Sequence, residues 1–131
     1  MAGAAALHLA EYLEDASVGT VGTNIFSGKL RATPAEQVAL LPYPGAPPEH
    51  VCGGGMTISK ERVQVLARST THAAAEALSW LCAQALSAIA NQTIEGSRYR
   101  SVMLMQTPGI LEYDADHNIV FVFNVEAERE V

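Results

Sequence analysis

Two segments of the chain carry apolar residues at helical spacing, residues 4–16 and residues 72–90. The apolar positions are Ala6, Leu9, Ala10 and Leu13 in the first, and Ala74, Ala75, Leu78, Leu81, Cys82, Ala85, Leu86, Ala88 and Ile89 in the second. Spacings of three and four residues place such side chains on one face of an α-helix. We therefore predict an amphipathic helix over each segment, the second beginning after an N-cap at Thr70 or Thr71.

Five shorter runs have the apolar content or the alternation of β-strands. They cover residues 24–30, 37–43, 61–68, 101–105 and 119–125. Alternation is clearest in 61–68, whereas 101–105 and 119–125 lack it, which indicates strands covered on both faces, or on one face plus a subunit contact. The order of elements predicts an α+β fold in which a single mixed or antiparallel sheet packs against two helices.

The segment 42–57, PYPGAPPEHVCGGGMT, differs in character from the rest of the chain. It holds four prolines and four glycines in sixteen residues, a composition that disfavours regular helix or strand. Loops of this length are uncommon inside a compact domain and are usually functional or disordered. We expect an extended loop or arm that orders against a neighbouring molecule, within a single domain covering residues 1–131; an insertion with no role is the alternative.

Trp80 lies opposite the apolar face of the second predicted helix, among Glu76, Gln84 and Ser87. Interfaces concentrate binding energy in Trp residues, and exposing so large an apolar side chain to water is unfavourable. We therefore predict that Trp80 contacts a partner, with an isolated surface Trp as the alternative. The remaining interface candidates come from the proline-rich segment and the last strand: Tyr43, Pro44, Pro47, Pro48, Phe121 and Phe123.

The composition limits the class of protein. The chain has 131 residues, of which 49% are apolar and 17% charged, and its net charge is −6. This is the size of one domain that can bury its own core. The 8 Lys and Arg residues are scattered, so no basic run could follow a phosphate backbone. No apolar run is long enough to span a membrane, and Cys52 and Cys82 form no CxxC motif.

Asp114, Asp116 and Asn118 place oxygen-bearing side chains at alternate positions, as the first half of a calcium loop does. Such a loop needs Gly at its sixth position and Glu at its twelfth, where this chain has Ile119 and Val125. We therefore predict the polar tip of a β-hairpin. Phosphate-binding glycine motifs are absent and the 4 histidines are dispersed. We expect no catalytic, cofactor-binding or metal-binding residues and no enzymatic activity.

An ordered set of short strings runs along nearly the whole chain. These are VGTVGTNIFSG at 18–28, Pro-Gly-x-Pro-Pro at 44–48, RVQV at 62–65, QTP at 106–108, Leu-x-x-Asp at 111–114, and FVFNV at 121–125 with its acidic tail. The set resembles the small tail-terminator and minor capsid proteins of long-tailed bacteriophages and related prophages. The GGG at 53–55 and the Ala-rich second helix depart from that resemblance.

The resemblance implies a structural virion protein without cofactors that assembles in the host cytoplasm as a ring, commonly a hexamer. Such a ring caps the tail tube, stops its polymerisation and offers a surface to the head connector. Its partners would be copies of itself, the tail tube protein and neck proteins, while DNA passes through its lumen without specific binding. Another head–tail joining protein of the neck, a stopper or adaptor, is the first alternative. A small-molecule-binding α+β module is the second, and it requires a defined ligand pocket.

Overall fold

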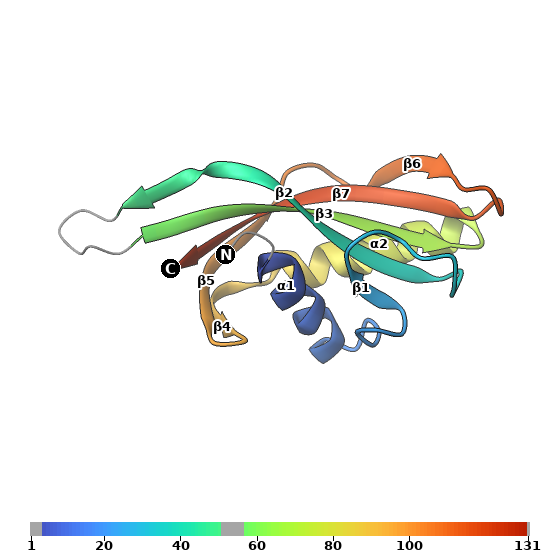
Figure 1. The fold of residues 1–131 in the computed structure, drawn as a ribbon. Helices are drawn as coiled ribbons and strands as arrows, with labels where there is room; N and C mark the ends of the chain where they lie inside the picture. Colours follow the sequence, from blue (N-terminus) through green and yellow to red (C-terminus); the bar gives the residue numbers. More distant parts are fainter. Residues whose placement is uncertain (1–3, 51–56, 131) are drawn as a thin grey trace.

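The protein folds as one curled mixed β-sheet with two α-helices on one of its faces, as a computed structural model shows (Figure 1). The structure describes residues 4–50 and 57–130. Its elements are α1 (Ala4–Asp15), β1 (Ile25–Ser27), β2 (Gln37–His50), β3 (Thr57–Ser69), α2 (His72–Ser87), β4 (Ala90–Ile94), β5 (Ser97–Leu104), β6 (Gly109–Tyr113) and β7 (Ile119–Glu130). The predicted α+β class, with a mixed sheet and two helices, is confirmed.

Strand β7 is the centre of the sheet. The strand order is β1-β2-β3-β7-β5-β4, and β6 also pairs with β7. Along one side β7 pairs with β3 from Ile119 to Glu130, while its other side is shared by β6 near its start and β5 near its end. Among the described strands β1 and β2 run parallel and the remaining pairs are antiparallel.

The two faces of the sheet differ in what covers them. Both helices lie on the same side (Figure 1), and we call this side the helix face and the other the open face. On the helix face, Val63, Val65, Phe123 and Val125 pack with both helices in the main hydrophobic core. The neighbouring positions along each strand point to the open face, because side chains alternate along a strand.

Helix α2 begins and packs mostly as its sequence predicts. Thr71 is its N-cap and accepts a hydrogen bond from the backbone N–H of Ala74 (3.2 Å). Its buried residues are Ala75, Ser79, Cys82, Ala83 and Leu86. Leu81, which we predicted on the core face, is 49% exposed instead. The polar side chain of Ser79 can be buried at little cost, because its hydroxyl donates a hydrogen bond to the carbonyl of Glu76 (2.7 Å).

Residues 42–50 belong to β2, so the prediction that 42–57 has no regular structure is wrong for this part. The pairing of β2 with β3 continues to His50 opposite Thr57, with register shifts on both sides of Ala46. Beyond its three pairs with β1, β2 is an edge strand, and edge positions and bulges tolerate prolines because the missing N–H is not needed there. Residues 51–56 lie outside the described part of the chain. Residues 44–50 and the facing start of β3 project from the body (Figure 1), and we call them the arm.

The hairpin formed by β4 and β5 contains a strand that the sequence pattern did not predict. The turn lies at Glu95 and Gly96, which both have positive φ angles, 48° and 78°, and Ile94 pairs with Ser97 across it. Two consecutive positive φ angles are typical of a type I′ turn, whose usual sequences are Asn-Gly and Asp-Gly. Glu-Gly lacks that signature, which explains why β4 was missed.

Candidate functional site

Side chains on the open face form a cross-strand row with a cavity above it. Leu41, Gln64 and Asn124 are direct register partners on β2, β3 and β7. At the far end of the row, the backbone N–H of Met105 donates to the carbonyl of Asn124 (2.9 Å). The cavity has a volume of about 250 Å³ and is lined by Leu41, Pro42, Tyr43, Gln64 and Asn124. It therefore lies where the arm leaves the body of the protein.

One polar atom in the floor of this cavity is unsatisfied. The side chain of Tyr43 points along the row toward β5, and its hydroxyl donates to the sulfur of Met105, the residue that follows β5 (3.4 Å). Oδ1 of Asn124, by contrast, is buried and accepts no hydrogen bond. Buried acceptors are almost always paired in native proteins, because an unpaired one costs free energy. This oxygen is enclosed by protein atoms, so it is a local cost in stability and not a position that an external donor can reach.

Toward the arm, acidic residues of β7 face basic residues of the neighbouring strands. The ion pairs are Arg62–Glu126 (3.2 Å), Lys60–Glu128 (3.9 Å) and Arg98–Glu130 (3.2 Å). Each pair is partly exposed and contributes little to stability, about 0–1 kcal/mol. Their main consequence is that the acidic tail of the sequence adds little net charge to this face of the sheet.

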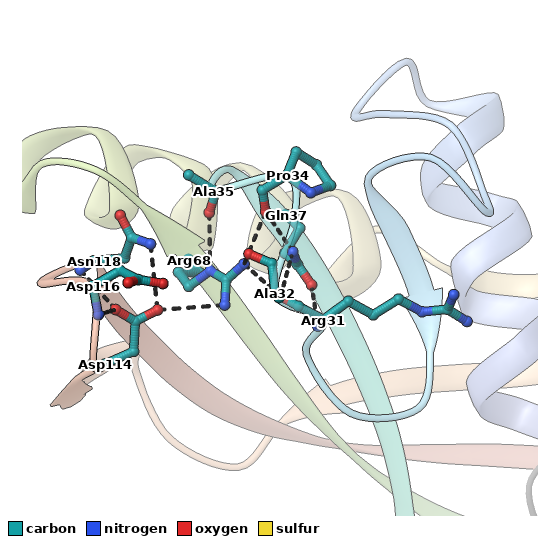
Figure 2. A network of polar contacts seen from close by, with 9 residues as sticks. All are labelled: Arg31, Ala32, Pro34, Ala35, Gln37, Arg68, Asp114, Asp116 and Asn118. Carbon is teal, nitrogen blue, oxygen red and sulfur yellow. Dashed lines mark hydrogen bonds and ion pairs between the residues drawn. The ribbon is translucent and has the colours of Figure 1, made fainter.

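Arg68 joins separate segments at the opposite end of the open face (Figure 2). Its side chain is only 6% exposed. Its guanidinium donates to the carbonyls of Arg31 (2.6 Å), Ala32 (3.2 Å), Pro34 (2.8 Å) and Ala35 (3.0 Å), and to a carboxylate oxygen of Asp114 (3.4 Å). The side chain of Gln37 binds the same loop, accepting from the backbone N–H of Arg31 (2.7 Å) and donating to the carbonyls of Arg31 and Pro34. Together they hold the loop 28–36 so that Leu30 packs against a small apolar cluster on this face.

Residues 114–118 form the tip of the hairpin between β6 and β7, as predicted. Oδ1 of Asp114 accepts from the backbone N–H groups of Asp116 (2.9 Å) and Asn118 (2.8 Å). His117 has a positive φ of 64°. Local side-chain to backbone bonds of this kind are the reason that Asp and Asn favour turns. In the part of the chain that the structure describes, no group of three or more His, Cys, Asp or Glu residues could hold a metal ion.

Replacing Asp114 with Asn is expected to destabilise the protein at neutral pH but not in acid. Partial burial acts to raise the pKa of Asp114, but hydrogen bonds from Asn118 and Asp116 and the charge of Arg68 outweigh it and lower this pKa below its usual value. A carboxyl with a lowered pKa stabilises the fold above its unfolded pKa of about 4, and this contribution is lost as the pH falls through the lower folded value. Urea midpoints of both proteins should therefore differ at pH 7 and converge below pH 4.

Asp116→Asn is the matched control for this hairpin tip. The structure gives the Asp116 side chain no hydrogen bond, since the bond at this residue comes from its backbone N–H. Its urea midpoint should equal that of the unaltered protein at both pH values. A midpoint difference for Asp114→Asn that persists unchanged at low pH would contradict the electrostatic explanation.

Exposed apolar side chains recur in β5, in β6 and in the segment between them. Met103, Met105, Ile110, Leu111 and Tyr113 are between 46% and 63% exposed, and we call these five residues the edge patch. In the described part of the chain β6 pairs with β7 alone, so its other side is a free edge. Natural proteins usually protect such edges with charges, prolines or coverage by another element. An apolar free edge is therefore a candidate surface for another polypeptide.

The predicted interface residues are found in four different places, three on the surface and one in the core. Trp80 is 40% exposed on the outward side of α2, and its contact with a partner stays a prediction. Tyr43 lines the cavity. Pro44, Pro47 and Pro48 belong to the arm, and their side chains lie outside the described part of the structure.

Phe121 and Phe123 are core residues, which corrects their prediction as interface residues. They are 3% and 0% exposed. Phe123 packs in the main core under the helices, and Phe121 packs with Ala75 and against the ring of His72 (5.2 Å between centroids). The sequence run around them lacks alternation because both faces of β7 are largely covered at its start.

Cys82, the cysteine in the described part of the chain, provides no candidate nucleophile. Burial raises the pKa of the free thiol of Cys82 to about 12, so this thiol is protonated and inert at neutral pH. Cys52 lies outside the described residues. Across residues 4–50 and 57–130, no helix has the length and apolar character needed to cross a membrane.

Comparison with known proteins gives three findings. The family model described as bacteriophage tail terminator protein matches residues 12–131. No curated protein matches the chain significantly. A chain in a solved structure described as the virion of a native gene transfer agent (GTA) particle has a similar fold, with a TM-score of 0.55 and 14% sequence identity over 99% of this chain and 92% of that one. At this identity the likeness concerns the fold alone.

Proposed function

Since this chain belongs to the family of bacteriophage tail terminator proteins, we propose that it forms a ring, commonly of six copies, on the end of the tail tube. It is a structural protein of the virion tail and not an enzyme. The ring stops polymerisation of the tube and offers a surface to the head connector. Its partners are further copies of the chain, the tail tube protein and the neck proteins. We also propose that residues 1–131 act as one domain in this assembly.

The free apolar edge of β6 is the observation that carries this proposal. A ring requires heterologous contacts, in which two different surfaces of the same chain fit each other and the rotation closes. The arm and β6 extend toward opposite ends of the molecule (Figure 1). Two distinct projecting or uncovered features at opposite ends are what a head-to-tail contact needs, and the edge patch supplies apolar area for it.

Two further properties favour a structural ring over the other functions considered. The cavity of about 250 Å³ is smaller than the roughly 300–1,000 Å³ of pockets that enclose drug-sized ligands, so this cavity by itself does not support a small-molecule-binding module. Three glutamates of β7 are matched by basic residues, so the open face presents no unmatched basic run to a phosphate backbone. This is compatible with DNA passing through the lumen without specific binding.

Shortening the arm is expected to abolish docking of the protein to the tail tube or the connector while leaving the monomer folded. The purified protein should form a ring, seen as a concentration-dependent mass by light scattering and as an annulus in negative-stain images. Deleting residues 45–55 removes most of the arm and keeps every core residue that the structure describes, so the circular dichroism spectrum should persist and docking to tube or connector should be lost. In a phage whose terminator gene carries the deletion, tails should become longer than normal.

A change in the other exposed hairpin is the control. Glu95→Asn places Asn-Gly at the turn between β4 and β5, which suits its positive φ angles, and should leave assembly and tail length unchanged. Overlong tails distinguish a terminator from a stopper or adaptor, whose loss leaves tail length normal. Normal tails and normal assembly after the arm deletion would contradict the proposed role of the arm.

A further inference from the structure

Seven of the eight large apolar side chains that are exposed in the described part of the chain fall into two sets. One set is the edge patch, with its five members. The other is formed by Trp80 and Leu81 on α2, which are 40% and 49% exposed. Gatherings of exposed apolar side chains mark surfaces that contact other molecules.

The outward side of α2 is almost without charge. Ala77, Trp80, Leu81 and Gln84 are exposed and share this side, because residues three and four apart are neighbours on a helix. We call these four residues the outer helix surface. Glu76 is the only Asp, Glu, Lys or Arg residue in the helix. A helix that faces water normally carries charged residues on its outer side, whereas a helix that is apolar all round is buried. The outer helix surface therefore has the composition of a covered surface.

The edge patch lies along one continuous free edge. Strand β6 and the end of β5 follow one another along the same side of β7, opposite residues 119–126. Among the described strands, β4 pairs with β5 only as far as Ser101, so it leaves this stretch uncovered. At about 3.3 Å per residue the edge is about 23 Å long. Native proteins protect such an edge with lysine or proline or cover it with a helix or loop, and β6 contains neither lysine nor proline.

We propose that the outer helix surface of one copy covers the edge patch of the next copy. The inference rests on the proposed ring and assigns its contact between copies to two surfaces. Helix α2 has 16 residues, so it is about 24 Å long at 1.5 Å per residue, and this length matches that of the edge. The contact covers both surfaces at once, and in the form that strand edges commonly take, beneath a helix.

A second copy of this chain is the occupant that fits both surfaces. Each surface is apolar and without Lys or Arg, so a single repeated contact buries both and leaves no cation unpaired. Met103 is the register partner of Glu126, whose neighbour Val125 points to the helix face, so Met103 points to the open face. The edge patch and α2 therefore face different directions, as a heterologous contact that closes by rotation requires. By contrast α1 exposes Glu14 and Asp15, which suit contact with water.

Ala77→Glu and Ile110→Lys should each prevent ring formation without unfolding the monomer. Either charge would have to leave water to enter an apolar contact, which is unfavourable, so the dissociation constant of the ring should rise at least about tenfold in sedimentation experiments. Both positions are exposed in the monomer, Glu is a good helix former and Lys is common on strand edges. Circular dichroism and the urea midpoint of the monomer should therefore stay unchanged.

Two further variants complete this experiment. Tyr113→Lys changes another member of the edge patch, which is 63% exposed, and should also prevent ring formation. It replaces Ile110→Lys if that variant does not fold. Gln92→Lys places the same charge on β4, at an exposed position outside both surfaces, and should leave ring formation unchanged.

Mixing the two defective variants tests that the surfaces meet. In a ring in which Ala77→Glu and Ile110→Lys copies alternate, every contact joins either Glu to Lys or two unaltered surfaces. No introduced charge is then buried alone. An equimolar mixture should form rings at a concentration where each variant by itself stays monomeric. Native mass spectrometry should show equal numbers of the two variants in these rings.

Three results would overturn the inference. Rings of unchanged affinity from Ala77→Glu or from the edge variants would show that the altered surface is not part of the contact. A mixture that stays monomeric would show that the two surfaces do not meet each other. Normal rings that no longer bind the tail tube would assign the altered surface to the tube protein. In these cases the unaltered protein still forms rings and the proposed function stands, whereas an unaltered protein without rings would contradict the ring itself and this contact with it.

Discussion

Arg68→Met should lower the free energy of unfolding by about 3–5 kcal/mol, the cost of breaking a buried charged network by removing one partner. Arg68 is the shared donor for four backbone carbonyls of the loop 31–35 and for Asp114. Met has a similar length and restores none of these bonds, so the loop should detach while the sheet beneath it persists. Urea denaturation followed by circular dichroism measures the loss, and hydrogen exchange should show reduced protection in residues 37–40 next to the loop.

Two other substitutions separate this network from an ordinary ion pair. Arg68→Lys keeps the charge but not the planar fork of donors, so it should recover only part of the stability. Arg98→Met breaks a pair in which the arginine side chain is 49% exposed, and should cost no more than about 1 kcal/mol. Equal losses for Arg68→Met and Arg98→Met would show that the loop is not held by Arg68.

Local sequence patterns predicted those elements whose structure is set by neighbouring residues. The helix over 72–90 was predicted because apolar spacing and an N-cap at Thr71 act within a few residues. The hairpin tip at 114–118 was predicted because Asp114 makes its bonds to residues two and four positions away. The strand at 42–50 was missed because prolines oppose strands in general, whereas here the position of β2 at an edge, a property of the whole sheet, permits them.

The candidate site could be predicted only in part, because most of it depends on contacts between distant segments. The exposure of Trp80 was predicted from helix geometry alone, since its direction follows from the residues around it, whereas its contact with a partner stays a prediction. Arg68 was not identified, because four of its acceptors are backbone carbonyls, which every residue type carries. The cavity over Gln64 and Asn124 was also missed, because it requires the register of three strands.

Phe123→Ala should destabilise the monomer by about 3–5 kcal/mol, the usual cost of truncating a buried Phe. Phe123 is fully buried in the main core, opposite Val65 of β3 and beneath the helices. Truncation removes its contacts with the surrounding side chains and leaves a cavity that close-packed neighbours fill only partly. The loss should therefore be measurable in urea at protein concentrations where no ring forms, because it does not depend on subunit contacts.

Met103→Ala provides the contrast that decides between a core role and an interface role. Met103 belongs to the edge patch and is 62% exposed, so its truncation should change the stability of the monomer by no more than about 0.5 kcal/mol while weakening assembly. The two substitutions thus have opposite expected profiles. If Phe123→Ala kept the urea midpoint of the monomer and abolished the ring, then Phe123 would be an interface residue after all, and the register that buries it beneath the helices would be wrong.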